Sequence, residues 1–121
     1  MISASNLVLL MLTHWLADFA LQTQEQANNK WSNSWALISH VGTYGICMSL
    51  VLLYLMPGEF SIVCKLFACA LLVSSHYCID YVTSKITHKL YEEKSYHDFF
   101  VVIGFDQFLH LLTIIPFCGG V

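Results

Sequence analysis

Two short segments of this chain combine a histidine with an aspartate inside sequence that is otherwise apolar. The first is HWLADF at residues 14–19, and the second is HYCIDY at residues 76–81. Imidazole nitrogens and carboxylate oxygens are donor atoms that bind zinc, manganese, iron or nickel in proteins. In a membrane, the same groups also relay protons or hydrogen-bond one helix to another. Each of these uses requires the two side chains of a segment to point the same way.

Helical spacing meets that requirement, because residues i and i+4 of an α-helix share a face. Three pairs in the sequence have this spacing: His14 and Asp18, His76 and Asp80, and Asp106 and His110. The third pair has the reverse order, but its helix is predicted to run the opposite way, so the groups keep the same order across the membrane. His40 adds a single histidine in another apolar segment.

Three aspartates in apolar helices need compensation, because a charged side chain at the bilayer centre costs roughly 2.5–3.5 kcal/mol on insertion scales. We therefore predict a metal site that holds a divalent ion, with zinc or manganese preferred. The predicted ligands are His14, Asp18, His40, His76, Asp80, Asp106 and His110. Two alternatives stay open: a proton or ion relay, and interhelical hydrogen bonding without a metal.

The composition indicates which elements must position these groups. Hydrophobic residues make up 57% of the 121 residues and charged residues only 11%, whereas a typical soluble domain has about 25% charged residues. This balance is typical of a membrane protein. The net charge of -3 and the lack of a basic stripe argue against a nucleic-acid partner.

Four segments approach or exceed the roughly 20 apolar residues that a helix needs to cross a bilayer. They lie near residues 5–22, 35–56, 60–84 and 97–118. Because lipid offers no partners to backbone polar groups, each segment is predicted to be a helix. The predicted fold is all-α: an integral-membrane four-helix bundle that forms a single domain over residues 1–121.

The polar connections indicate the orientation of the bundle. Residues 23–34 and 85–96 are predicted loops on one face, and a tight turn at Pro57–Glu59 joins the second and third helices. Four of the five lysines lie in those two loops: Lys30, Lys85, Lys89 and Lys94. The positive-inside rule then places both loops in the cytoplasm. The two similar His/Asp motifs lie on helices that run in the same direction, which suggests two parallel two-helix repeats.

Four polar residues near the cluster have predicted supporting roles. Gln22 and Gln107 could orient a ligand by hydrogen bonding. Lys30 and Lys85 lie where the cavity would open and could bind an anionic group as point charges. The simpler reading is that the glutamines are polar residues at a helix end or in a packed interface, and that the lysines are attracted to anionic lipid.

Together these motifs resemble a family of small multi-pass membrane proteins of bacteria and phages, which is catalogued as a domain of unknown function. The resemblance spans nearly the whole chain and rests on HWLADFALQ at 14–22, Lys30, His40, SHYCIDYVTSK at 74–85 and DQFLH at 106–110. It implies an integral protein of the bacterial inner membrane and brings no activity with it. The placing of histidines in membrane helices is more loosely similar to inner-membrane metal-dependent hydrolases.

The first functional hypothesis is a metal-dependent hydrolase that acts on a phosphoester or a lipid headgroup at the cytoplasmic face. The bound metal would activate water, and Asp18, Asp80 or Asp106 would be the catalytic carboxylate. Membrane lipid is then the expected partner. The alternatives are a proton- or metal-coupled transporter or channel subunit, which would require a homodimer, and a non-catalytic membrane interaction protein of a bacterium or phage.

Overall fold

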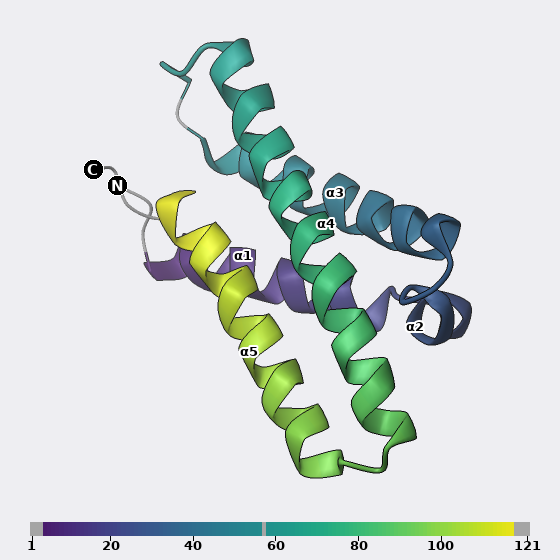
Figure 1. Ribbon diagram of the computed structural model, residues 1–121. Coiled ribbons are helices and arrows are strands. Elements are labelled where there is room, and N and C mark those ends of the chain that lie inside the picture. Colours follow the sequence, from purple (N-terminus) through teal and green to yellow (C-terminus); the bar gives the residue numbers. More distant parts are fainter. Residues whose placement is uncertain (1–3, 57, 118–121) are drawn as a thin grey trace.

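The computed structural model describes residues 4–56 and 58–117, and these residues form helices joined by short connections (Figure 1). The elements are α1 (Ala4–Trp15), the π-helical η1 (Leu16–Ala20), α2 (Gln24–Asn29), α3 (Ser34–Leu55), α4 (Ile62–Glu92), α5 (Tyr96–Ile114) and the 3-10 turn η2 (Ile115–Phe117). No strand occurs among the described residues, so the predicted all-α class is confirmed. Among the described residues, three helices are long and apolar enough to cross a membrane, within Ser34–Leu55, Ile62–Glu92 and Tyr96–Phe117. The first apolar helix, Ala4–Ala20, is shorter.

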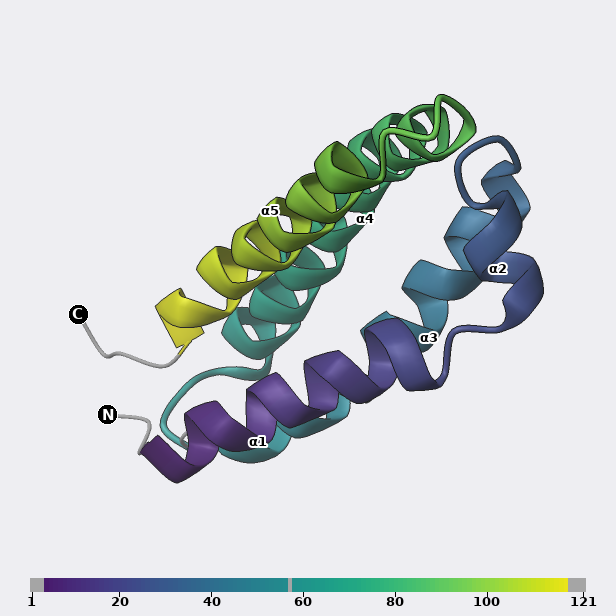
Figure 2. The same ribbon diagram turned by 90° about the horizontal axis from the view of Figure 1, so that it is seen from below.

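The helices form two antiparallel pairs, α1 with α3 and α4 with α5. The pairs cross obliquely and diverge like the arms of a V from the end where α3 leads into α4 (Figure 2). The short helix α2 lies at the open end of the V. There the ring of Trp31 stacks on the ring of His88, with centroids 3.6 Å apart, and links the α2 segment to the end of α4.

Polar residues in the connections begin each of three helices. Thr23 and Gln26 form a capping box at the start of α2, in which each side chain bonds to the backbone of the other. The Asn33 side chain accepts from two backbone N–H groups of α3, and Ser61 accepts from one of α4. These bonds satisfy donors that a helix leaves unpaired at its first turn. Of the three helices, α3 and α4 begin within two residues of the predicted positions.

The closed end of the V is filled by apolar side chains. All four long helical segments contribute to this apolar core, which comprises Leu10, Ala17, Tyr44, Met48, Leu52, Ala68, Cys69, Leu72 and Ile114. Large apolar residues such as Ile46, Val63 and Phe100 are instead exposed on the outside of the V. Such an outer surface suits contact with lipid, which is as apolar as these side chains.

The predicted charged loop over residues 85–96 is wrong, because α4 continues as a helix to Glu92. The connection to α5 shrinks to residues 93–95, and Lys94 turns the chain with a positive φ of 58°. A charged sequence can extend a helix in water, where pairs at i and i+4 such as His88 with Glu92 (3.3 Å) support it. Hydropathy indicates where a helix leaves the lipid, which need not be where the helix ends.

One further connection differs from the prediction, and two predicted positions lie outside the described residues. The connection 23–34, predicted to be a loop, contains α2. Of the predicted turn at Pro57–Glu59, Pro57 lies outside the described residues, as does position 118 at the predicted end of the last helix.

We expect Gly45→Ala to destabilise the protein relative to Gly42→Ala. A Cβ at Gly45 would lie 3.0 Å from a Val73 methyl of α4, whereas a Cβ at Gly42 meets nothing within 4 Å. Overpacking costs about 1–3 kcal/mol, while Gly→Ala in an open helix position gains up to about 1 kcal/mol. Thermal unfolding in detergent would measure the difference, and Val73→Ala should rescue Gly45→Ala. Equal melting temperatures for the two single variants would contradict the close approach of α3 and α4.

Candidate metal centre

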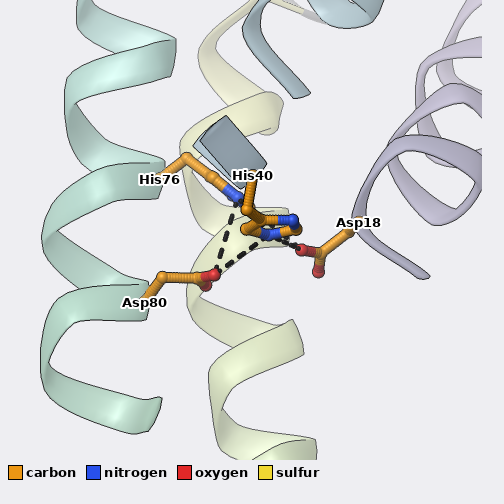
Figure 3. A group of neighbouring side chains, drawn as sticks. All are labelled: Asp18, His40, His76 and Asp80. Atoms are coloured by element: carbon orange, nitrogen blue, oxygen red, sulfur yellow. Dashed lines mark hydrogen bonds and ion pairs between the residues drawn. The ribbon is translucent and has the colours of Figure 1, made fainter. Parts of the chain in front are cut away.

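Four buried side chains converge between the arms of the V. Asp18 comes from η1, His40 from α3, and His76 and Asp80 from α4, and Figure 3 shows all four pointing toward one another. The π-helical turn at Leu16–Ala20 includes Asp18 and places it in the interior; such turns occur frequently at functional sites. The structure thus brings together four of the seven predicted ligands in one group, His40 included.

The separations within this group are those of ligands around one ion. His40 Nε2 lies 3.1 Å from Asp18 Oδ1 and 3.1 Å from Asp80 Oδ2. His76 Nε2 lies 3.3 Å from His40 Nε2, 3.6 Å from Asp18 Oδ1 and 3.8 Å from Asp80 Oδ2. Ligand atoms at roughly 2.0–2.2 Å from a tetrahedral zinc ion are themselves about 3.3–3.6 Å apart. The five distances given between the four ligand atoms are therefore close to those between the ligands of a tetrahedral zinc ion.

Hydrogen bonding alone does not satisfy this group. His40 Nε2 has two carboxylate oxygens and a second imidazole nitrogen within 3.3 Å, but a ring nitrogen carries at most one proton. The single proton of His40 Nε2 therefore cannot form a direct hydrogen bond to all three of these atoms. The ring of Tyr44 stacks on His76 at 3.6 Å between centroids and holds that imidazole in place. The chemistry of this donor set fits a divalent cation.

Gln107 connects the remaining predicted ligands to this group. Its side-chain oxygen lies 3.0 Å from His14 Nε2 and accepts the proton of that nitrogen. Its amide nitrogen donates to Asp18 Oδ2 at 3.1 Å and to Asp106 Oδ2 at 2.9 Å. Every polar atom of the amide is thus used, which places Gln107 where the sequence predicts a residue that orients ligands.

His110 and Asp106 lie beside Asp80 on the neighbouring helix α5. His110 Nδ1 donates to the backbone oxygen of Asp106 at 2.9 Å, and His110 Nε2 lies 3.5 Å from Asp80 Oδ1. The Thr83 hydroxyl donates to Asp106 Oδ1 at 2.6 Å. All seven predicted ligands are therefore neighbours, in three overlapping groups whose donor atoms lie within 4.8 Å of one another.

Lys30 supplies the only lysine contact to the buried carboxylates among the described residues. Its Nζ lies 2.9 Å from Asp80 Oδ2, and its side chain is 20% exposed. The residue ends α2, which Gln26 ties to α3 through a hydrogen bond to Ser39. One ammonium group faces two aspartates that are nearly fully buried, so the cluster retains negative charge that a metal ion would balance.

A cavity of about 610 Å³ lies on the side of the open end of the V and reaches the four-residue group at Asp18; His40, His76 and Asp80 do not line it. Asp18, Asp106, Gln107 and Lys30 line its inner part. Its outer part is lined by residues near the end of α4 and by the α2 segment, including His88, Tyr91 and Trp31. The apolar core closes the opposite end of the V, so in the described residues the cluster opens toward one side.

Two of the predicted supporting residues are placed differently from the rest. Lys85 does not line the cavity; its ammonium lies 3.5 Å from the centroid of the Tyr81 ring on the exposed side of α4. Because α4 continues through Lys85, the ammonium lies over the Tyr81 ring of the same helix and not at the predicted cavity mouth. Gln22 lines the cavity, but its buried Oε1 has no hydrogen-bond partner among the described residues.

Two contributors to the site have no counterpart in the sequence-based prediction. Thr83 lies three residues after Asp80, so helical spacing places it on the same face and could have indicated its role. The stacking of Trp31 on His88 joins residues far apart in the chain, and nothing in the sequence indicates that pairing.

Comparison with known proteins identifies a family for this chain, but the description of that family gives no activity. The family model described as "Protein of unknown function (DUF3307)" matches residues 6–120. This match confirms the resemblance to a family of unknown function, while an origin in bacteria or phages stays a prediction. No curated protein and no solved structure matches the chain.

Lys30→Met should destabilise the metal-free protein by about 3 kcal/mol, because removing one partner leaves the Asp80 carboxylate buried without its cation. Lys85→Met is the matched control and should change little. Added zinc should stabilise Lys30→Met more than the parent protein, because no ammonium then competes for Asp80 Oδ2. Thermal unfolding in detergent, with a chelator and with zinc, measures both effects. Equal stability of the two variants in chelator would show that Lys30 does not balance the buried charge.

Proposed function

Because the chain belongs to the DUF3307 family, whose description assigns no activity, we propose from the site itself that the protein is a membrane-bound, metal-dependent hydrolase of phosphoesters or lipid headgroups. The observation that carries this proposal is the buried group of two imidazoles and two carboxylates at metal-ligand separations, which meets a cavity at Asp18. Metal catalysts need such a ligand set together with room for a substrate beside it.

The length of α4 supports a position for the site near one surface of the membrane. Its 31 residues extend about 46 Å, whereas the hydrocarbon core is about 30 Å thick. A crossing of about 20 residues that starts at Ile62 ends close to Asp80, with His76 about 6 Å deeper. We place the lysine-rich end of α4 in the cytoplasm of a bacterium, by the positive-inside rule, and the four apolar helices as one bundle in the inner membrane.

A divalent metal held by His40, His76, Asp18 and Asp80 would polarise the phosphoryl group and activate a water molecule. Zinc and manganese suit this ligand set. Such an ion would also share Asp80 Oδ2 with Lys30, which weakens the hold of the carboxylate on the ammonium. Lys30 lines the cavity and would then bind the anionic group of the substrate.

Asp106 is the best-placed general base. It lines the cavity, its side chain is 14% exposed, and Thr83 and Gln107 hold its two oxygens. In the proposed reaction, Asp106 takes a proton from the attacking water as its oxygen bonds to phosphorus. The ester P–O bond breaks, and the same proton passes to the leaving alcohol oxygen, so that water is divided between the two products.

The conducting alternative receives less support from this structure. A path across the membrane would have to pass the closed end of the V, where residues such as Met48, Leu52 and Leu72 form the apolar core. Intramembrane carboxylates and imidazoles mark ion pathways when they continue across the bilayer, but here the buried polar groups lie on the cavity side of that core. The interaction-protein alternative predicts that these groups only stabilise the fold.

We expect the protein purified without a metal-binding tag to contain metal, and His76→Ala/Asp80→Ala to lose it, because the variant removes two of four ligands. Mass spectrometry of the bound metals is the measurement. His97→Ala is the matched control, since His97 is an exposed histidine at the start of α5. No metal in the parent protein, after supplementation with zinc or manganese, would contradict the proposal.

The metal-loaded protein should hydrolyse phosphoesters presented in detergent micelles. Asp106→Asn should lower kcat by about 10²–10⁴-fold while the bound metal stays unchanged, because it removes only the general base. Asp98→Asn, at an exposed aspartate of the same helix, should retain activity. If the protein binds metal but hydrolyses no phosphomonoester, phosphodiester or phospholipid, the hydrolase proposal is contradicted and only metal binding is supported.

The proposed orientation predicts different accessibility to a membrane-impermeant reagent for three positions in the connections between helices. In a variant without native cysteines, Ser32→Cys and Glu93→Cys should resist a membrane-impermeant maleimide in spheroplasts, because both lie at the cytoplasmic end. Gly58→Cys should react, since it lies at the opposite end of α4. All three positions are exposed in the isolated chain, so lysed cells give full labelling as the control. The reverse pattern would invert the orientation and contradict a cytoplasmic site.

A further inference from the structure

The two oxygens of Asp80 face different histidines. Oδ2 lies 3.1 Å from His40 Nε2 and belongs to the metal centre described above, but Oδ1 points to the other side, 3.5 Å from His110 Nε2. Asp18 is divided in the same way, with Oδ1 3.1 Å from His40 Nε2 and Oδ2 3.8 Å from His14 Nε2. One ion at the first position uses only one oxygen of each carboxylate.

The contact between His110 and Asp80 is favourable only with a positive charge between the two atoms, either a proton on Nε2 or a bound metal ion. His110 Nδ1 donates its proton to the backbone oxygen of Asp106, so in the neutral ring Nε2 bears a lone pair. That nitrogen is buried, its side chain is 0% exposed, and it has no hydrogen-bond partner among the described residues. A lone pair and a carboxylate oxygen repel each other at 3.5 Å in a dry interior, whereas two ligands of one ion lie at this separation.

His110 belongs to two groups of donors. Ligand atoms of His14, Asp18 and His110 lie within 4.8 Å of one another, and so do those of Asp80, Asp106 and His110. We propose that a second divalent ion binds between His110 and Asp80, completed by Asp18 and His14, so that both aspartates bridge the two ions through opposite oxygens. This proposal rests on the metal-dependent function proposed above. Binding requires the proton of His14 to move from Nε2 to Nδ1, which has no hydrogen-bond partner among the described residues, and the Gln107 oxygen to turn away from Nε2.

The second ion also specifies the class of substrate. With the imidazoles neutral, two divalent ions and Lys30 exceed the charge of the three aspartates by two positive charges. A phosphate monoester carries up to two negative charges and balances this excess, whereas a diester carries one. Two ions about 3.5–4 Å apart stabilise both the attacking and the leaving oxygens of a phosphoryl transfer. The site is therefore matched to a phosphomonoester, either a lipid with a terminal phosphate or a soluble one.

The experiment counts the ions and tests their coupling. Tag-free protein is loaded with zinc for metal analysis and with manganese for electron paramagnetic resonance. We expect two equivalents of zinc per chain in the parent protein and in His97→Ala, and one in His110→Ala. Two manganese ions that share carboxylate bridges should give an exchange-coupled signal in the parent protein, which His110→Ala replaces with the signal of an isolated ion.

The possible results distinguish failure of the second-ion proposal from failure of the proposed metal-dependent function. One equivalent of metal with an uncoupled signal in the parent protein overturns the second ion and leaves the hydrolase proposal standing. No metal at all overturns both. Two coupled ions in folded His110→Ala exclude His110 as a ligand and so overturn the assigned position. If His110→Ala fails to fold, the coupling in the parent protein alone decides between one ion and two. Activity on phosphomonoester lipids compared with soluble phosphomonoesters, in the same micelles, distinguishes the two sources of substrate.

Discussion

The buried negative charge of Asp18 and Asp80 is the constraint on which the rest of this structure depends. Their side chains are 4% and 1% exposed, and an ionised carboxylate away from water is costly unless it is paired and hydrogen-bonded. The imidazoles, Lys30 and the amide of Gln107 are arranged around these two groups. Lys30 contacts only Asp80 of the two carboxylates, and the cluster around them could hold a metal ion.

The V-shaped arrangement reconciles this polar centre with an apolar environment. At the closed end, residues such as Leu10, Met48 and Leu72 pack together and exclude water. At the open end, α2 and the extension of α4 form a cavity into which a polar substrate can enter. The same four helical segments thus support both ends, and the boundary between them lies at the level of His76.

The extension of α4 decides which groups meet. Asp80 precedes the end of α4 by 12 residues, and Asp106 follows the start of α5 by 10, so a short turn between the helices brings the two aspartates to nearly the same depth. Had α4 ended at residue 84, as its hydropathy indicates, the Asp106–His110 pair would lie about two turns too deep. Residues 85–92 provide none of the candidate ligands. By extending α4, they bring Asp106 and His110 of α5 level with His76 and Asp80 of α4.

The sequence by itself determined the apolar helices, the shared faces of the three His/Asp pairs and the family, because these depend on local composition and on the spacing of 3.6 residues per turn. The placing of His40 among those pairs, the bonds of Gln107 and the partnership of Lys30 with Asp80 were decided only by the tertiary structure. So was the removal of Lys85 from the site. Each of these depends on how far a helix continues and on how two helix pairs cross, and those features are set by contacts between segments remote in the chain.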